Sequence, residues 1–278
     1  VQWRIPKNIF LKLIYVLFGL IRLVISSPIR TSYFLTNSIS SNKNTALIYG
    51  FCTFLTFRCY EQIKFNLASH KVNCKIVGIG PGYSFPYDGP THHGVQDLYL
   101  MYLIPEMEVF NIADNNLSNQ ISKNINKING PTYIRLDKGN MNYNNKIKYS
   151  ISDGFNIVFK NSKAKVLIIS SGYMCNLAVN EAKNNKNVSV LNLFKFKNIN
   201  EGKLLRIIKN YKKIIIYDEC TYWGGFTPIV SSLLIKNKLK INLNILSSPD
   251  KQLFKYSQNR DEIHEYLKIS PKYLRKLF

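Results

Sequence analysis

The sequence predicts an α/β protein built from two open, mostly parallel, three-layer sheets. Three observations lead to this fold class. The chain has 278 residues, of which 46% are hydrophobic, so it is long enough for two domains with buried cores. Short apolar runs alternate with segments of helical spacing, which favours parallel βαβ units. A polar, asparagine-rich stretch, Gly139–Asp153, divides two series of these units.

The first series of strands and helices is predicted within residues 45–140. Its strands are apolar runs bounded by turn residues, and its helices carry apolar residues three and four positions apart. The predicted strands are Thr45–Phe51, Lys75–Ile79, Glu108–Ile112 and Pro131–Leu136, and the predicted helices are Phe57–His70, Val95–Leu103 and Asn115–Ile128. The Gly/Pro-rich loop Gly80–Gly94 follows the second strand and is long enough to be functional rather than a mere connection.

The second series follows a predicted linker at residues 141–153 and occupies residues 154–278. It repeats the alternation of apolar strands and helices, so a second, smaller parallel sheet is expected. The predicted strands are Lys165–Ser170, Val188–Asn192, Lys213–Tyr217 and Ile241–Ile245, and the predicted helices are Asn176–Lys183, Glu201–Lys209 and Gly225–Lys236.

Residues 1–44 form an atypical N-terminal segment. The first 60 residues contain no Asp or Glu, and Ile9–Ile25 is apolar except for Lys12, Gly19 and Arg22. Seventeen residues with two cations are a poor membrane span, and Ser26-Ser27-Pro28 is a poor signal-cleavage site. Three interpretations remain open: a membrane-associated helix, a buried helix of the first domain, or sequence that no longer encodes the proper start of that domain. Membrane contact through residues 9–25 is not the favoured one.

The formal net charge of +22 does not predict a nucleic-acid partner, because the lysines are scattered singly among asparagines and isoleucines. Five widely spaced cysteines without a C-x-x-C pair are typical of reduced core thiols in a cytoplasmic protein. Four histidines without an H-E-x-x-H or similar spacing indicate no metal site.

The loop Gly80–Gly94 is the first candidate site. In open parallel sheets, ligands bind at loops beyond the carboxyl ends of the strands. Asp88, His92 and His93 of this loop could transfer protons or bind hydroxyl groups, and its glycines and prolines allow close approach of a ligand. Alternatively, the histidines cap the helix that follows.

A second candidate site follows the first predicted strand. Phe51, Phe54 and Phe57 could stack on a flat heterocycle, and Arg58 could bind an acidic group. Core packing is the competing explanation for these aromatic residues. Arg135 is either a phosphate clamp or a surface ion pair with the acidic residue that follows it.

Phosphate-binding motifs are missing from the sequence. It contains no P-loop, no G-x-G-x-x-G that opens a helix, and no Gly-Asp-Gly followed 25–30 residues later by an Asn, which would bind magnesium diphosphate.

Taken together, these residues resemble the transketolase family. The resemblance is carried by Phe54–Ile63, Lys75–Gly80, Gly89–Asp97, Ile104–Met107 with Ala113-Asp114, and Pro131–Leu136, in the order and spacing of the pyrimidine-binding domain. Asp218-Glu219-Cys220, Gly224-Gly225-Phe226 and Asp250–Leu277 are similar to the transketolase C-terminal domain. The resemblance covers residues 45–278 and implies the folds of these two domains in that order.

The resemblance also implies roles for individual residues. An aromatic residue near Phe54, with Phe51 and Phe57 as rivals, would stack on the aminopyrimidine ring of thiamine diphosphate. His92, with His93 and Asp88 beside it, would line the substrate channel, and Arg135 would bind the substrate phosphate.

Two departures from the family pattern qualify this expectation. The diphosphate-binding domain is missing from the sequence, so the cofactor and its Mg²⁺ would be held together with a partner subunit that carries this domain. The family's glutamate, in a Gly-Ile-Ala-Glu-Gln-like motif, has no counterpart in Gly19–Ser41, and Glu61 is a poor substitute.

The resulting hypothesis is the C-terminal subunit of a split transketolase-like enzyme of carbohydrate metabolism. It would transfer a two-carbon ketol unit between sugar phosphates, in a homodimer or heterotetramer, with activity impaired by the missing glutamate. The alternatives are a deoxyxylulose 5-phosphate synthase-like subunit, a 2-oxo acid dehydrogenase beta-like subunit and a non-catalytic, degenerate paralogue.

Overall fold

A computed structural model describes residues 45–138, 141, 147–254, 257 and 259–278 of the protein. The predicted N-terminal segment, with its possible membrane contact at residues 9–25, and residues 142–146 of the predicted linker lie outside these residues. Within the described residues there is no helix that is long and apolar enough to span a membrane.

The first half contains a four-stranded parallel sheet, as the apolar runs predict. Its strand order is β1-β2-β4-β3, which requires crossover connections through helices. The strands are β1 (Ala46–Phe51), β2 (Cys74–Ile79), β3 (Glu108–Asn111) and β4 (Thr132–Leu136). The helices are α3 (Cys52–Arg58), α4 (Tyr60–Gln62), η1 (Ile63–Ala68), α5 (Asp97–Tyr102), α6 (Asn115–Asn124) and η3 (Ile125–Lys127).

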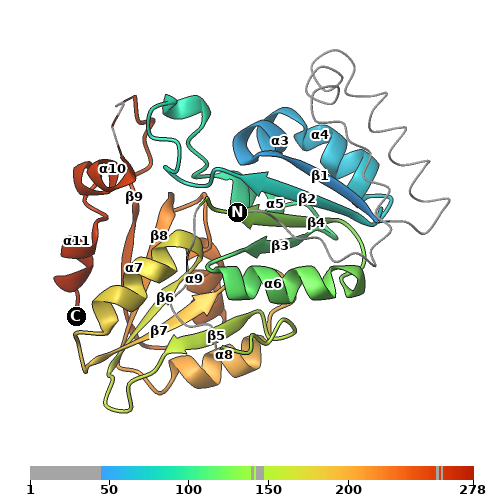
Figure 1. The fold of residues 1–278 in the computed structure, drawn as a ribbon. Coiled ribbons are helices and arrows are strands. Elements are labelled where there is room, and N and C mark those ends of the chain that lie inside the picture. The colour runs from blue at the N-terminus through green and yellow to red at the C-terminus, as the bar shows by residue number, and fades with distance from the viewer. Residues whose placement is uncertain (1–44, 139–140, 142–146, 255–256, 258) are drawn as a thin grey trace.

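The second half contains a five-stranded sheet in the order β5-β7-β6-β8-β9 (Figure 1). Its strands are β5 (Phe155–Phe159), β6 (Val166–Ser170), β7 (Val188–Leu193), β8 (Lys213–Thr221) and β9 (Asn242–Ser248). Its helices are α7 (Gly172–Ala182), α8 (Glu201–Ile208), α9 (Thr227–Lys236), α10 (Arg260–Tyr266) and α11 (Pro271–Arg275). Both sheets are open and mostly parallel, so the predicted fold class is confirmed.

The structure differs from the sequence prediction at several elements, and β8, for example, runs to Thr221 rather than ending at Tyr217. The first helix begins at Cys52, directly after β1, rather than at Phe57. Helix α7 begins at Gly172 rather than at Asn176. Strand β5 was not predicted, and it is the antiparallel strand of its sheet, paired with β7 at the edge. Its run Phe155–Phe159 is apolar except for Asn156, so the sequence does carry the signal of a strand at this position.

Backbone hydrogen bonds join the two sheets. The amide of Asn111 in β3 donates to the carbonyl of Phe194 (2.9 Å), and the amide of Phe196 donates to the carbonyl of Val109 (3.0 Å). An antiparallel bridge between Phe110 and Lys195 lies between these two bonds. The free edge of β3 is therefore paired with the segment that follows β7.

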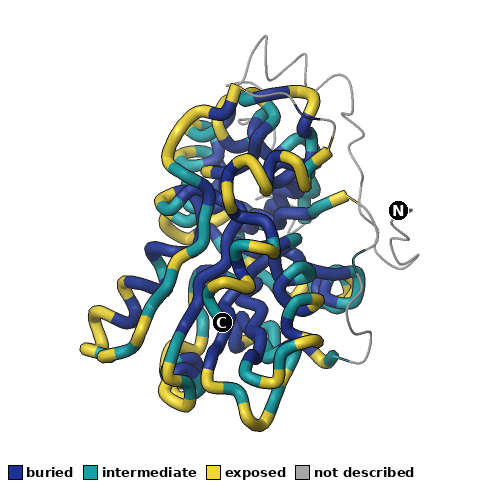
Figure 2. The backbone as a smooth tube through the Cα atoms, turned by 90° about the vertical axis from the view of Figure 1, so that its left-hand side faces the viewer, coloured by how far each residue is buried: buried dark blue, intermediate teal, exposed yellow. Residues whose placement is uncertain are grey.

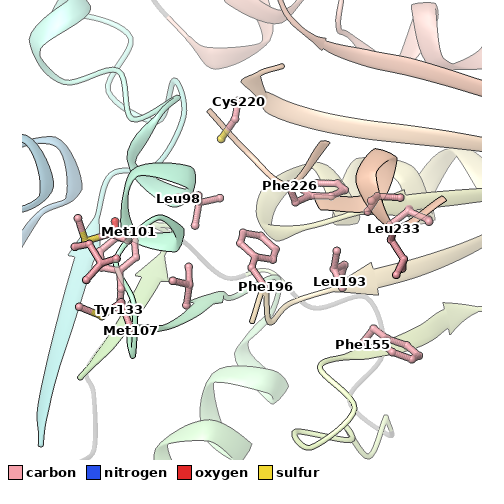
Figure 3. Packing of buried hydrophobic residues seen from close by; sticks show 14 of the residues in the cluster. Leu98, Met101, Met107, Tyr133, Phe155, Leu193, Phe196, Cys220, Phe226 and Leu233 are labelled. Atoms are coloured by element: carbon pink, nitrogen blue, oxygen red, sulfur yellow. The ribbon is translucent and has the colours of Figure 1, made fainter. Parts of the chain in front are cut away.

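The hydrophobic core is continuous across this junction. Leu98 and Met101 of α5 belong to the same buried cluster as Phe196 and Phe226, whose rings lie 5.9 Å apart (Figure 3). Buried residues run through the middle of both halves, while exposed residues are concentrated at the periphery (Figure 2). The two halves therefore share apolar area instead of forming separate cores.

Glycines allow the halves to approach closely at three points. A Cβ atom added at Gly82 would overlap the carboxylate of Glu219, and one at Gly224 would overlap the carbonyl of Val95. A Cβ atom at Gly172 would lie 2.7 Å from the side-chain nitrogen of Asn111. Each of these glycines faces a residue of the other half.

Candidate functional site

The loop of residues 80–94 leaves β2 at the carboxyl end of the sheet and lies between α3 and α10 (Figure 1). Gly82 and Gly94 close its base through two reciprocal hydrogen bonds, of 2.7 and 2.9 Å, between their amides and carbonyls. Gly80 and Gly82 adopt φ values of +77° and +56°, which are accessible to glycine at little cost. The loop is therefore a closed turn with a fixed base, and it includes the short 3₁₀ helix η2 (Gly89–Thr91).

Four rings gather between this loop and the end of β1. The ring centroid of Phe51 lies 5.6 Å from that of Phe54, 5.1 Å from that of Phe85 and 5.4 Å from that of His92. The rings of Phe54 and His92 lie 4.9 Å apart. We call these four residues the aromatic cluster. All four are only partly buried, and their edge-to-face geometry is the one that aromatic pairs prefer.

Two exposed cations flank the aromatic cluster. The guanidinium of Arg58 lies 4.3 Å from the centroid of the Phe54 ring, and the ammonium of Lys138 lies 4.5 Å from that of Phe85. Phe57, in contrast, is 43% exposed and lies outside the cluster. The structure thus brings together Phe51, Phe54, Arg58 and His92 of the predicted site residues, and it separates Phe57 from them.

The two adjacent histidines have different surroundings. His92 is half-buried, and its Nδ1 lies 3.0 Å from the hydroxyl of Thr91. His93 is 4% exposed and packs against the Tyr83 ring at 5.0 Å. Burial lowers the pKa of His93, and the charge of Glu219 partly opposes this shift. Among the described residues its Nε2 has no hydrogen-bond partner, so this nitrogen could bind a polar group of a ligand.

Asp88 lies at the exposed outer end of the loop. Its position is open to solvent, unlike that of His93, although its charge raises the pKa of His93 slightly against the effect of burial.

Arg135 is buried rather than exposed. Its guanidinium donates to the carbonyl of Gly94 (2.5 Å) and to Sγ of Cys220 (3.3 Å), and its Nε lies 3.3 Å from Asp97. The hydroxyl of Tyr133 donates to the same Asp97 carboxylate (2.6 Å). Burial raises the pKa of Asp97, and the Arg135 charge counteracts this effect. The predicted phosphate clamp is therefore an arginine with protein partners on several sides.

Two neighbouring carboxylates of β8, Asp218 and Glu219, complete the surroundings of the loop. Asp218 accepts hydrogen bonds from the amides of Cys220 and Phe226, both at 3.1 Å, and so holds the turn after β8. Glu219 accepts a bond from the amide of Tyr83 (3.3 Å) at the base of the loop. Sequence reasoning did not assign a site role to Glu219, to Phe85 or to Lys138. Two acidic residues at the end of a buried strand were the signal that could have identified Glu219.

Metal ligands do not cluster in the part of the chain that the structure describes: no group of three or more His, Cys, Asp or Glu side chains could hold a metal ion there.

Comparison with known proteins gives two family matches. The family described as "Transketolase, pyrimidine binding domain" matches residues 36–144, and "Transketolase, C-terminal domain" matches residues 156–273. The two matches follow each other along the chain in the same order as the two sheets.

Curated relatives have low but extended similarity. One of the subunits of the apulose-4-phosphate transketolase of Actinobacillus succinogenes is 25% identical over 193 residues, which cover 68% of this chain and 62% of that protein. The 1-deoxy-D-xylulose-5-phosphate synthase of Photobacterium profundum is 28% identical over 222 residues, or 79% of this chain and 35% of the synthase. The chain thus spans less than two thirds of the length of either relative.

Solved structures have the same fold. A protein described as "Split gene transketolase, inactive beta4 tetramer" superimposes with a TM-score of 0.76 at 22% identity, covering 88% of this chain and 78% of that one. The transketolase of Campylobacter jejuni gives a TM-score of 0.68 at 15% identity, covering 88% of this chain and 37% of that one.

Proposed function

We propose that this chain, which belongs to the transketolase family, is the C-terminal subunit of a split thiamine diphosphate enzyme. It would transfer a two-carbon ketol unit between sugar phosphates. The observation that carries the proposal is the succession of a pyrimidine-binding domain and a transketolase C-terminal domain in one chain. Further support comes from a relative that is itself named as one subunit of a transketolase and is covered over 62% of its length.

The proposed assembly includes a partner subunit with the diphosphate-binding domain and Mg²⁺, in a homodimer or heterotetramer in the cytoplasm. The proposed boundaries are residues 45–140 for the pyrimidine-binding domain, 141–153 for the linker and 154–278 for the C-terminal domain.

The aromatic cluster fits the pyrimidine part of the cofactor. A flat heterocycle gains stabilisation from partly exposed rings, and Phe54 with Phe51 offers such a surface at the end of β1. His93 adds a buried, unpartnered ring nitrogen nearby. We therefore assign Phe54 to ring stacking, with Phe51 and Phe57 as the alternatives and Arg58 beside them. When bound, thiamine diphosphate would supply the carbanion chemistry that ketol transfer needs.

His92, His93 and Asp88 would face the sugar substrate. The lowered pKa of His93 keeps its imidazole neutral near pH 7, so that its Nε2 can accept or donate a proton at a substrate hydroxyl. Arg135 as the ligand of the substrate phosphate remains a prediction. To bind a phosphate, Arg135 would have to give up its buried contacts with Asp97 and Gly94.

We further propose that catalysis is impaired. The first 60 residues contain no carboxylate, so nothing there can act as the family's glutamate, which protonates the pyrimidine ring. A degenerate, non-catalytic paralogue is the alternative that this observation favours. A deoxyxylulose 5-phosphate synthase-like subunit is favoured by similarity to such synthases at up to 28% identity, and a 2-oxo acid dehydrogenase beta-like subunit is the remaining alternative.

Calorimetry with thiamine diphosphate and Mg²⁺ tests the proposal, with the chain alone and mixed with a diphosphate-domain subunit. We expect binding only in the mixture. Phe54→Ala should weaken it by about tenfold or more, because stacking on the aromatic cluster is lost. Phe65→Ala removes a 55% exposed ring outside the cluster and should leave binding unchanged.

A ketol-transfer assay of the same mixture distinguishes the catalytic proposals. Weak turnover with sugar phosphates is the expected result, and a normal kcat would contradict the proposed impairment. No cofactor binding in any mixture would instead favour the non-catalytic paralogue.

A further inference from the structure

The carboxylate of Glu219 connects the C-terminal helix α10 to the loop of residues 80–94. Arg260 Nε donates to Oε1 of Glu219 (2.5 Å), a second guanidinium nitrogen of Arg260 pairs with Oε2, and Nε2 of His264 lies 2.6 Å from Oε1. These side chains are between 0 and 11% exposed. Burial alone would raise the pKa of Glu219, but the charge of Arg260 and the hydrogen bonds from Arg260 and His264 hold it well below its ordinary range. Glu219 is therefore a buried, charged carboxylate.

The same carboxylate holds the base of the loop. It accepts the hydrogen bond from the Tyr83 amide, and it occupies the space that a side chain at residue 82 would need. Gly82 is the residue that pairs with Gly94 to close the loop. A shift of Glu219 would consequently displace both strands of the loop base.

Arg260 contacts four different residues. Besides the two bonds to Glu219, its guanidinium donates to Asp137 Oδ2 (2.7 Å) and to the carbonyl of Pro81 (3.4 Å). It also lies 3.8 Å from the centroid of the Tyr173 ring in α7. One side chain of the C-terminal helix thus contacts the end of β4, the end of β8, the loop and α7. An isolated ion pair would join only two of these elements.

A row of rings extends from this network to the candidate site. The ring centroids of His93 and Tyr83 lie 5.0 Å apart, and those of Tyr83 and His264 lie 6.3 Å apart. The Tyr83 ring therefore lies between the buried histidine of the loop and the histidine of α10.

We propose that Glu219, Arg260 and His264 are positioning residues that hold the loop of residues 80–94, and with it His92 and His93, in its ligand-binding geometry. The C-terminal helix is thereby part of the site. The ligand-binding role of the loop rests on the proposed function. The contacts of Glu219, Arg260 and His264 with the loop do not depend on that function.

Hydrogen exchange of the full chain, followed by mass spectrometry, tests the proposal without cofactor or partner. In Arg260→Met, the carboxylates of Glu219 and Asp137 lose their cation, so exchange of the loop should rise by about tenfold or more. Arg260→Lys keeps the charge and should restore part of the protection. The control is Arg275→Met, on the same C-terminal segment, which breaks the pair of the 58% exposed Arg275 with Glu181 of α7 and should change loop exchange by less than about twofold.

The imidazole signals give a second readout, because the chain has four histidines. The charge of Glu219 raises the pKa of His93 against the effect of burial, so Glu219→Gln should lower the His93 pKa further and shift the signal of His92, while the signal of His70 stays unchanged.

Unchanged loop exchange and unchanged His93 titration in folded variants would overturn the proposal. So would a uniform rise in exchange over all segments, because that indicates a general loss of stability. If Glu219→Gln fails to fold, the rise in loop exchange in Arg260→Met and its partial reversal in Arg260→Lys still test the proposal. Absence of ketol transfer would contradict the proposed function but neither of these results.

Discussion

At the end of β8, two adjacent carboxylates meet opposite environments. Glu219 faces Arg260 and His264 and stays charged, whereas Asp218 is buried among backbone amides. Burial raises the pKa of Asp218 to about 6. The two residues therefore affect stability at different pH values, although they are neighbours in the sequence.

The Asp218 shift predicts a specific pH dependence. An aspartate in an unfolded chain has a pKa of about 3.9, so between about pH 4 and pH 6 the native state holds a proton that the unfolded chain has lost. Asp218 should thus lower the free energy of unfolding as pH rises through this interval, by up to about 3 kcal/mol. Asp218→Asn removes this dependence, so the wild type should lose stability relative to the variant from pH 4 to pH 6, as measured by urea denaturation.

Asp261→Asn, at an exposed position, is the control and should follow the wild-type profile. A constant difference between wild type and Asp218→Asn over the whole interval would show that Asp218 is charged at all these pH values.

At the level of single residues, part of the aromatic cluster could be predicted from the sequence. Phe51, Phe54 and His92 were identified because they follow the ends of strands, where ligands bind in parallel sheets. The burial of Arg135 was not predicted, because its partners Asp97, Gly94 and Cys220 come from three other segments. Glu219 was missed as a site residue for the same reason: its partners Arg260 and His264 lie 41 and 45 residues further along the chain.

Among the secondary-structure elements, helix α6 illustrates how a single side chain sets a boundary. Asp114 accepts the Leu117 amide (2.6 Å) at the N-terminus of α6 and the Tyr149 hydroxyl (2.7 Å) from within the predicted linker. Asn200 caps α8 in the same way, by accepting the Lys203 amide (3.0 Å), but it is exposed.

The comparison of these caps gives a second prediction. Asp114→Ala should lower the free energy of unfolding by about 2–4 kcal/mol, because a cap and a buried hydrogen bond are lost together. Asn200→Ala also loses the hydrogen bond from Nδ2 to Asp153 (2.9 Å), but the Asn200 side chain is exposed to solvent, so the variant should cost only about 1 kcal/mol. Thermal or urea unfolding of both variants measures the difference, and equal losses would show that the Tyr149 contact contributes nothing.

The strands of the first sheet were easier to predict than its helices. Apolar runs placed β1, β2 and β4 within one residue of their ends, since fully buried strands need continuous apolar sequence. Helix α3 begins five residues before its predicted start, because its threonines and phenylalanines have low intrinsic helix propensity. Its helical conformation depends on packing against β1, β2 and α5, which no local pattern reports.

For the whole molecule, the pair of Arg135 and Asp97 is one of the buried charge contacts near the junction of the halves. Arg135 lies in β4, Asp97 begins α5, and Cys220 belongs to β8 of the second sheet. Removing one charge of a buried pair leaves the other charge buried without a partner of opposite sign, which destabilises the folded state.

Arg135→Met should therefore lower the free energy of unfolding by about 3–5 kcal/mol. In the double variant Arg135→Met/Asp97→Asn the loss should be smaller than the sum of the single losses, because neither charge then remains alone. Arg275→Met, at an exposed pair, should cost less than about 1 kcal/mol. Strict additivity of the two single losses in denaturant unfolding would show that the two side chains do not interact.

The three glycines that contact the opposite half limit how the sequence of this protein can evolve. Gly82 meets Glu219, Gly224 meets Val95 and Gly172 meets Asn111, so each half limits which residues the other can accept at these positions. A chimera that joins residues 45–140 of this chain to the C-terminal domain of a distant relative would fail wherever the relative has a side chain at such a contact. We therefore expect recombination to exchange the two domains together rather than singly.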